Sequence, residues 1–184
     1  MTKGIKVLLL VVVLFFVMGT SPRLVEAHPH NPNIETLPEC ESITPVAHFP
    51  EDVNWEDFNA KVSNYFSVGE VTEKDRRRIP QTNKVKWNVI RLANELDKVR
   101  CYWGAPIYVT SWYRPARINS MVGGVRGSQH IKGSAADIRP DISRIYKFQS
   151  WLDKGLWKNR ALGYGARKGF VHVDLREGGI RWGY

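Results

Sequence analysis

Between about Asn83 and Arg100 the chain carries one long amphipathic pattern. Apolar residues recur three and four positions apart, with charged residues between them. This spacing predicts a helix with one buried face, formed by Val85, Val89, Leu92, Leu96 and Val99. We therefore expect a core helix here, and the rest of the chain must supply the surface that covers its apolar face.

Short β-rich segments follow this helix and predict a small sheet. β-branched and aromatic composition or alternation marks four candidate strands, at 106–112, 134–138, 170–176 and 180–182. Gly178-Gly179 predicts a turn that joins the last two strands as a hairpin. Helical spacing returns at 141–152. Helices segregated from a small antiparallel sheet make an α+β domain, with the sheet packed against the helices.

Residues 1–27 have the pattern of a signal peptide. Lys3 and Lys6 form a basic start, Val7–Met18 is an unbroken apolar run, and Val25-Glu26-Ala27 offers a cleavage site. The sequence therefore predicts an exported protein, whether periplasmic, bound to the cell wall or secreted. An uncleaved segment would instead hold the protein at a membrane, and this alternative stays open.

The remaining chain divides by composition at about residue 82. Residues 28–82 begin with a stretch rich in proline and polar groups, which predicts an N-terminal arm and linker with a short helix around 55–62. Residues 83–184 hold the helix and the candidate strands, and we expect them to form the functional domain, most simply as a monomer.

Charge and cysteine content narrow the range of partners. The formal net charge of +9 suits contact with a polyanion such as a wall polymer, nucleic acid or acidic lipid. No nucleic-acid-binding motif is present, so no specific nucleic acid is expected.

Cys40 and Cys101 can form a disulfide in an oxidising compartment, although sequence alone does not fix their distance. No CxxC pair occurs, which argues against a zinc site built on thiolates.

Two histidines and two aspartates stand in positions that suit a metal site. His130 precedes Asp137 through a loop that leads into a candidate strand, and His172 and Asp174 lie two apart, on one face of another strand. Catalytic zinc commonly takes three His or carboxylate ligands and keeps a position for water. The spacing alone favours the other interpretation, in which His130 is a loop histidine and Asp137 only forms hydrogen bonds at the end of a strand.

Three segments together resemble the signature blocks of the zinc D-Ala-D-Ala carboxypeptidase family. They are Thr110-Ser111-Trp112-Tyr113-Arg114-Pro115, Ser128-Gln129-His130 through Gly133 to Asp137-Ile138, and Phe170-Val171-His172-Val173-Asp174, in the family's order. The resemblance covers about residues 83–184. That family shares its zinc fold with hedgehog signalling domains and with murein and phage peptidases. The resemblance implies one zinc ion per chain, held by His130, Asp137 and His172.

The same resemblance implies a substrate site around Arg114. A fixed guanidinium there would hold the terminal carboxylate of the substrate or stabilise the oxyanion formed during hydrolysis. Ser128 or Gln129 would add a hydrogen bond to the substrate. The alternative for Arg114 is a surface arginine stacked on a neighbouring aromatic ring.

The general base is the point at which the chain departs from the family. Many relatives carry Glu or Asp three residues before the last zinc histidine, and here that position is Gly169. Asp174 is the predicted substitute, because it shares a strand face with His172, and Glu177 is the second choice. Asp174 can instead orient a metal ligand, which metal sites commonly require.

The expected function is a zinc peptidase that hydrolyses peptide bonds containing D-amino acids in peptidoglycan. It would be a D-Ala-D-Ala carboxypeptidase or a murein endopeptidase, using water activated by the metal. The alternative is a hedgehog-like zinc module that binds the wall or a protein without catalysis, which the glycine at position 169 keeps open.

Overall fold

The computed structural model describes residues 38–184, so the predicted signal peptide and the first part of the predicted arm lie outside the described residues. Within residues 38–184, no helix combines the length and apolarity that a membrane crossing requires.

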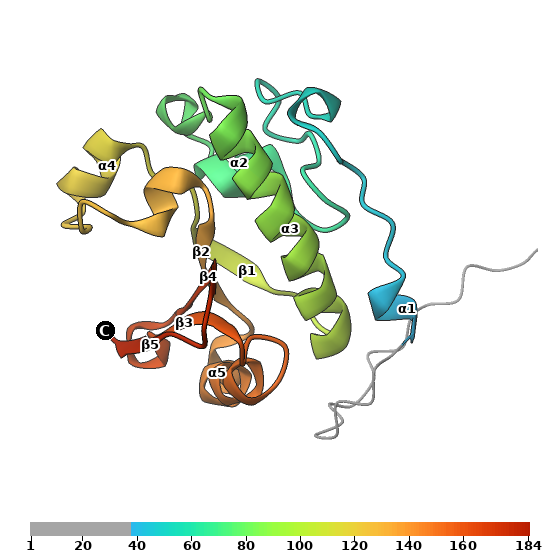
Figure 1. Ribbon diagram of the computed structural model, residues 1–184, viewed down its shortest axis with the longest axis vertical. Helices are drawn as coiled ribbons and strands as arrows, with labels where there is room; N and C mark the ends of the chain where they lie inside the picture. Colours follow the sequence, from blue (N-terminus) through green and yellow to red (C-terminus); the bar gives the residue numbers. More distant parts are fainter. Residues whose placement is uncertain (1–37) are drawn as a thin grey trace, which may run out of the picture.

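A five-stranded sheet forms the centre of the fold (Figure 1). Its spatial order is β1-β2-β4-β3-β5. Neighbouring strands are antiparallel except for β3 and β5, which are parallel. The strands are β1 (Tyr108–Ser111), β2 (Ala135–Arg139), β3 (Arg160–Tyr164), β4 (Val171–Glu177) and β5 (Arg181–Gly183). The predicted α+β class is confirmed, but the sheet is mixed and not purely antiparallel.

The predicted hairpin at Gly178-Gly179 is wrong. The backbone N–H groups of both glycines donate to the carbonyl oxygen of Asn159, at 3.0 and 3.2 Å, so the chain passes over the end of β3. Both glycines have positive φ, of 92° and 64°, which L-residues with a side chain rarely adopt. The last strand therefore reaches the far side of β3 and becomes an edge of the sheet.

Helices flank the sheet, and the longest is the predicted core helix, α3 (Figure 1). It begins after Thr82, whose side chain accepts a hydrogen bond from the N–H of Val85, and it ends at Gly104 in a left-handed conformation. The α-helices are α1 (Pro38–Glu41), α2 (Val68–Thr72), α3 (Asn83–Trp103), α4 (Ala116–Met121) and α5 (Ile145–Lys154). Short 3-10 turns are η1 (Pro50–Asp52), η2 (Arg76–Arg78), η3 (Gln129–Lys132), η4 (Ile142–Arg144) and η5 (Ala166–Lys168).

Alternation along the strands separates the core from the polar face of the sheet. Ala136, Ile138, Val171, Val173 and Leu162 belong to one core cluster with residues of α3 and α5. The two helices meet where the Trp103 ring lies 4.9 Å from that of Phe148 and 5.3 Å from that of Trp151. Because successive side chains point to opposite faces, the intervening positions of β2 and β4 face away from this core. Asp137, His172 and Asp174 occupy those positions.

Most of the described part of the predicted arm packs into this same core. Apolar side chains from Ala47 to Ile79 belong to the cluster that contains α3, so the packed unit begins well before residue 83. The buried carboxylate of Asp97 on α3 accepts hydrogen bonds from the Ser63 hydroxyl and from the backbone N–H groups of Asn64 and Tyr65, at 2.7 to 3.2 Å. Segment 55–62 forms turns and not the predicted helix.

Cys40 and Cys101 form a disulfide that ties α1 to the end of α3, with their Cα atoms 5.6 Å apart. The predicted pairing is confirmed. The Tyr102 hydroxyl also donates to the Glu41 carboxylate at 2.6 Å, so a noncovalent contact lies beside the covalent one.

Candidate metal centre

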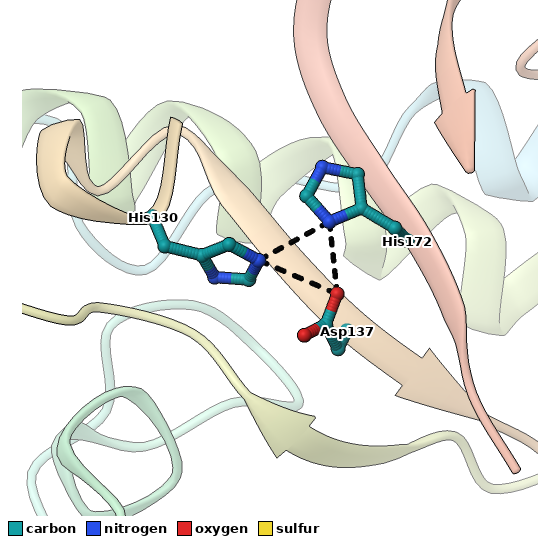
Figure 2. Close-up of side chains that lie close together, drawn as sticks. All are labelled: His130, Asp137 and His172. Carbon is teal, nitrogen blue, oxygen red and sulfur yellow. Dashed lines mark hydrogen bonds and ion pairs between the residues drawn. The ribbon is translucent and has the colours of Figure 1, made fainter. Parts of the chain in front are cut away.

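Three side chains converge on the polar face of the sheet (Figure 2). His130 Nε2 lies 3.1 Å from His172 Nδ1 and 3.3 Å from Asp137 Oδ1, and the last two atoms are 2.8 Å apart. All three residues are buried. The ligand atoms of a tetrahedral zinc ion, at about 2.0–2.2 Å from the metal, lie about 3.3–3.6 Å from one another. The three atoms are therefore close to the spacing that one metal ion requires.

The register of the sheet brings two of these residues together. Asp137 on β2 is the direct cross-strand partner of His172 on β4. Directly paired residues of an antiparallel sheet project from the same face with their Cβ atoms about 4.5–5.5 Å apart. The pairing therefore places a carboxylate oxygen and an imidazole nitrogen next to each other without any irregularity of the backbone.

The third residue, His130, is fixed by the packing of η3 on α3. Gly133, which ends η3, has a φ of +73°, and a Cβ atom there would meet the carbonyl oxygen of Val85 at 2.9 Å. The Asn88 amide donates to the Lys132 carbonyl oxygen at 2.9 Å, and the Trp112 indole N–H donates to that of Gly133 at 3.2 Å. Only glycine allows this close approach, which seats η3 at the start of β2.

Both imidazole rings have their outer nitrogen engaged by an oxygen atom. His130 Nδ1 lies 2.6 Å from the carbonyl oxygen of Trp112, and His172 Nε2 lies 3.2 Å from Asp174 Oδ2. An oxygen acceptor at one nitrogen holds the proton there and leaves the lone pair of the other nitrogen for a metal. Both remaining nitrogens are the ones that converge with Asp137, so the donor set fits a metal ion.

The electrostatics of Asp137 agree with this fit. Burial alone would raise the pKa of the Asp137 carboxyl, but hydrogen bonds that His130 and His172 donate to it in the metal-free site outweigh burial and hold the pKa well below its usual value. A bound metal ion would take the place of these two donated protons. Asp137 is thus an anion at neutral pH. Two neutral imidazoles and one carboxylate would leave a divalent metal ion with residual positive charge, as catalysis by a Lewis acid requires.

Asp174 lies behind His172, in the position of an orienting residue. Its side chain is fully buried and accepts hydrogen bonds from Arg176 at 2.8 to 3.2 Å in addition to its contact with His172. Burial would raise the pKa of Asp174, but its bonds with His172 and Arg176 lower it. It does not line the pocket above the site. The predicted role as general base fits this geometry poorly, because a base must reach a water molecule on the substrate side.

Glu177, the second predicted base, does not line the pocket. It is exposed at the end of β4, where it pairs with Arg160 of β3 in the sheet register. Gly169 lies at the C-cap of η5, two residues before β4, with a φ of +85°.

A cavity of about 470 Å³ opens over the metal centre, and the three predicted substrate residues line it. Arg114 Nη1 lies 3.9 Å from Asp137 Oδ2, and the backbone N–H of Arg114 donates to the His130 carbonyl oxygen at 3.1 Å. The Ser128 hydroxyl accepts the N–H of His130, and the Gln129 side-chain oxygen accepts the Ser134 hydroxyl at 3.0 Å. The structure thus brings Arg114, Ser128 and Gln129 to the metal centre.

The cavity is also lined by C-terminal residues that the sequence analysis did not assign to the substrate site, namely Arg176, Trp182, Gly183 and Tyr184. Burial and the negative charge of Asp137 raise the pKa of Tyr184 to about 12, which keeps its hydroxyl protonated. The position of Arg176 could have been predicted from sequence, because it lies two residues after Asp174 and therefore on the same face of β4 as His172 and Asp174. Trp182 had none, since its place depends on β5 crossing to β3.

Comparison with known proteins places the chain in a family. No curated protein matches the sequence. The family model described as Peptidase M15 matches residues 64–174, more than half of the chain, and this range includes His130, Asp137 and His172. The match confirms the resemblance noted in the sequence and starts before α3, in agreement with the extent of the core. The chain belongs to the Peptidase M15 family.

Proposed function

We propose that this peptidase is zinc-dependent and hydrolyses peptide bonds containing D-amino acids in peptidoglycan. The observation that carries the proposal is the convergence of His130 Nε2, Asp137 Oδ1 and His172 Nδ1 beneath a cavity with an arginine beside them. One zinc ion per chain would be held by these three atoms. When bound, zinc lowers the pKa of a coordinated water molecule and polarises the scissile carbonyl group.

Arg114 supports a role in substrate binding. Its side chain is only 17% exposed, and its Nε is buried without a hydrogen-bond partner among the described residues. A buried N–H without a partner is costly, and a substrate carboxylate or oxyanion would satisfy it. Within this proposal, Arg114 holds the terminal carboxylate of the peptide or the developing oxyanion, while Ser128 and Gln129 form one rim of the site.

We propose further that the protein acts outside the cytoplasm as a monomer. The pattern of residues 1–27, the positive net charge of +9 and the Cys40–Cys101 disulfide all suit an oxidising compartment in contact with a polyanionic wall.

A noncatalytic zinc module is the second candidate, and one observation favours it. No Asp or Glu side chain lines the described cavity, and Gly169 occupies the position where many relatives carry the base. A module of this kind would hold zinc through the same three atoms and bind a wall peptide without cleaving it.

The deciding experiment incubates the purified protein with muropeptides in three conditions, namely as prepared, with a chelator, and with the chelator followed by excess zinc. Mass spectrometry of the products should show loss of one D-Ala or splitting of a crosslinked dimer, suppressed by the chelator and restored by zinc. A protein that holds one zinc per chain yet leaves every muropeptide intact would contradict hydrolysis and favour the binding module.

Replacing Arg114 with methionine should lower kcat/KM for the cleaved muropeptide by about 100-fold, because removal of one oxyanion or carboxylate contact typically costs this much. Zinc content should stay at the wild-type level, since Arg114 is not one of the converging ligands. The exposed Arg117 of α4 provides the matched control, and Arg117→Met should leave kcat/KM unchanged. Equal kinetics for both variants would remove Arg114 from the substrate site.

A further inference from the structure

Arg176 connects the wall of the cavity to the metal centre. Its Nε donates to both carboxylate oxygens of Asp174, at 3.0 and 3.2 Å, and its Nη2 donates to Oδ2 at 2.8 Å. The same Oδ2 faces His172 Nε2. His172, Asp174 and Arg176 lie two residues apart along β4 and therefore project from the same face of the strand. Their side chains form a continuous chain of contacts.

The geometry of this chain leaves Asp174 little freedom. A guanidinium that grips both oxygens of a carboxylate fixes its plane as well as its position. Asp174 is fully buried, whereas Arg176 is 41% exposed, so the charged partner of the buried carboxylate reaches it from the cavity side. Without the guanidinium of Arg176, the Asp174 carboxylate would keep two contacts that define its orientation. They are the backbone N–H of residue 176, which donates to Oδ1 at 2.9 Å, and His172.

Trp182 covers this connection. Its ring lies 5.3 Å from the Arg176 guanidinium and 5.0 Å from the His172 ring. The ring fits here because its cross-strand partner is Gly163, where a Cβ atom would meet the indole at 2.9 Å. The indole therefore shields the contacts between Arg176, Asp174 and His172 and limits the movement of the guanidinium.

The β5 strand is itself firmly held, so the position of Trp182 is well defined. Arg181 donates to the carboxylate of Asp153 at 2.5 Å and to the carbonyl oxygens of Trp157 and Lys158 at 3.0 and 3.1 Å. These bonds attach β5 to the end of α5 and the turn that follows it.

From these contacts we propose that Arg176 is a positioning residue for the metal ligand His172, acting through Asp174. The inference rests on the proposed zinc site and adds a residue beyond the end of the family match at residue 174. Arg176 fixes Asp174, Asp174 fixes the proton on His172 Nε2, and His172 Nδ1 is thereby presented to the metal. Loss of the Arg176 side chain should therefore weaken zinc binding, although Arg176 does not contact the metal.

The test compares zinc affinity among variants by competition with a chromophoric chelator, which requires no catalytic turnover. Residues that orient metal ligands typically contribute about 10–100-fold to metal affinity, and we expect Arg176→Met to weaken zinc binding by about 10-fold. Arg176→Lys should restore part of the loss, because an ammonium can donate to Asp174 but cannot hold both oxygens in a fixed plane.

Arg160 provides a matched control on the neighbouring strand. Its guanidinium pairs with Glu95 at 3.0 Å and lies 5.3 Å from the Trp157 ring, so it makes the same two kinds of contact away from the metal centre. Arg160→Met should keep wild-type zinc affinity. Thermal unfolding of each metal-free variant shows whether the fold is intact.

Three results would overturn the inference. Unchanged zinc affinity in Arg176→Met would show that Asp174 is fixed without the guanidinium. Equal losses in Arg176→Met and Arg160→Met would indicate general destabilisation and not positioning. A wild-type protein that binds no zinc would refute the proposed zinc site itself, and with it the role of Arg176, whereas the first two results leave the proposed function standing.

Discussion

Replacing His130 with alanine is expected to remove high-affinity zinc binding and peptidase activity together. The substitution leaves Asp137 Oδ1 and His172 Nδ1 as the only converging donors of the site. If the roughly 10–16 kcal/mol of a four-ligand zinc site is shared evenly among its ligands, one ligand contributes about 3 kcal/mol, or more than 100-fold in affinity. Activity should fall further, to background, because the proposed reaction requires the bound metal.

Zinc content by metal analysis and muropeptide cleavage by mass spectrometry measure the two effects in the same preparation. His48 is exposed and outside the centre, so His48→Ala should retain both zinc and activity. Asp137→Asn adds a near-isosteric test, because it removes the negative charge while keeping the shape of the side chain. Full zinc content with wild-type activity in His130→Ala would exclude the metal centre described above.

The three converging side chains were predictable from sequence, and the reason lies in local patterns. The two-residue spacing of His172 and Asp174 fixes them on one strand face whatever the sheet order, and the structure confirms this through their 3.2 Å contact. The family motif supplied His130 and Asp137. What no local pattern contained was the pairing of Asp137 with His172 across β2 and β4, because strand order depends on the whole fold.

The errors in the predicted fold came from interactions between distant segments. Gly178-Gly179 resembles a hairpin turn locally, but the bonds to Asn159 carry the chain past β3. That crossing brings Trp182 to the cavity, so its place there could not be predicted from the local sequence. The burial of Asp97 likewise depends on a distant segment, because the turn at Ser63 and Asn64 lies against it. The orienting role, which the sequence had left open for Asp174, is favoured by the Arg176 guanidinium, because only the structure shows it bound to the Asp174 carboxylate.

Removing the Cys40–Cys101 disulfide should destabilise the fold strongly and leave the metal centre intact. The bond spans a sequence separation of 61 residues, a segment that includes α2 and nearly all of α3. Closing a loop of this length restricts the unfolded chain by an amount equivalent to about 4 kcal/mol. For a domain of this size, that corresponds to a fall of roughly 10 °C in the melting temperature.

The double variant Cys40→Ala/Cys101→Ala, compared with wild type by urea and thermal unfolding, measures this effect. The expected result combines a lower melting temperature with unchanged zinc content at low temperature, because His130, Asp137 and His172 all lie outside the closed loop. A reducing agent should lower the stability of wild type towards that of the variant and have no effect on the variant itself. An unchanged melting temperature would contradict this prediction. It would mean that the contacts of α1 with α3, including that of Tyr102 with Glu41, hold the two ends together without the covalent bond. It would also mean that the unfolded chain is compact enough for the cross-link to restrict it very little.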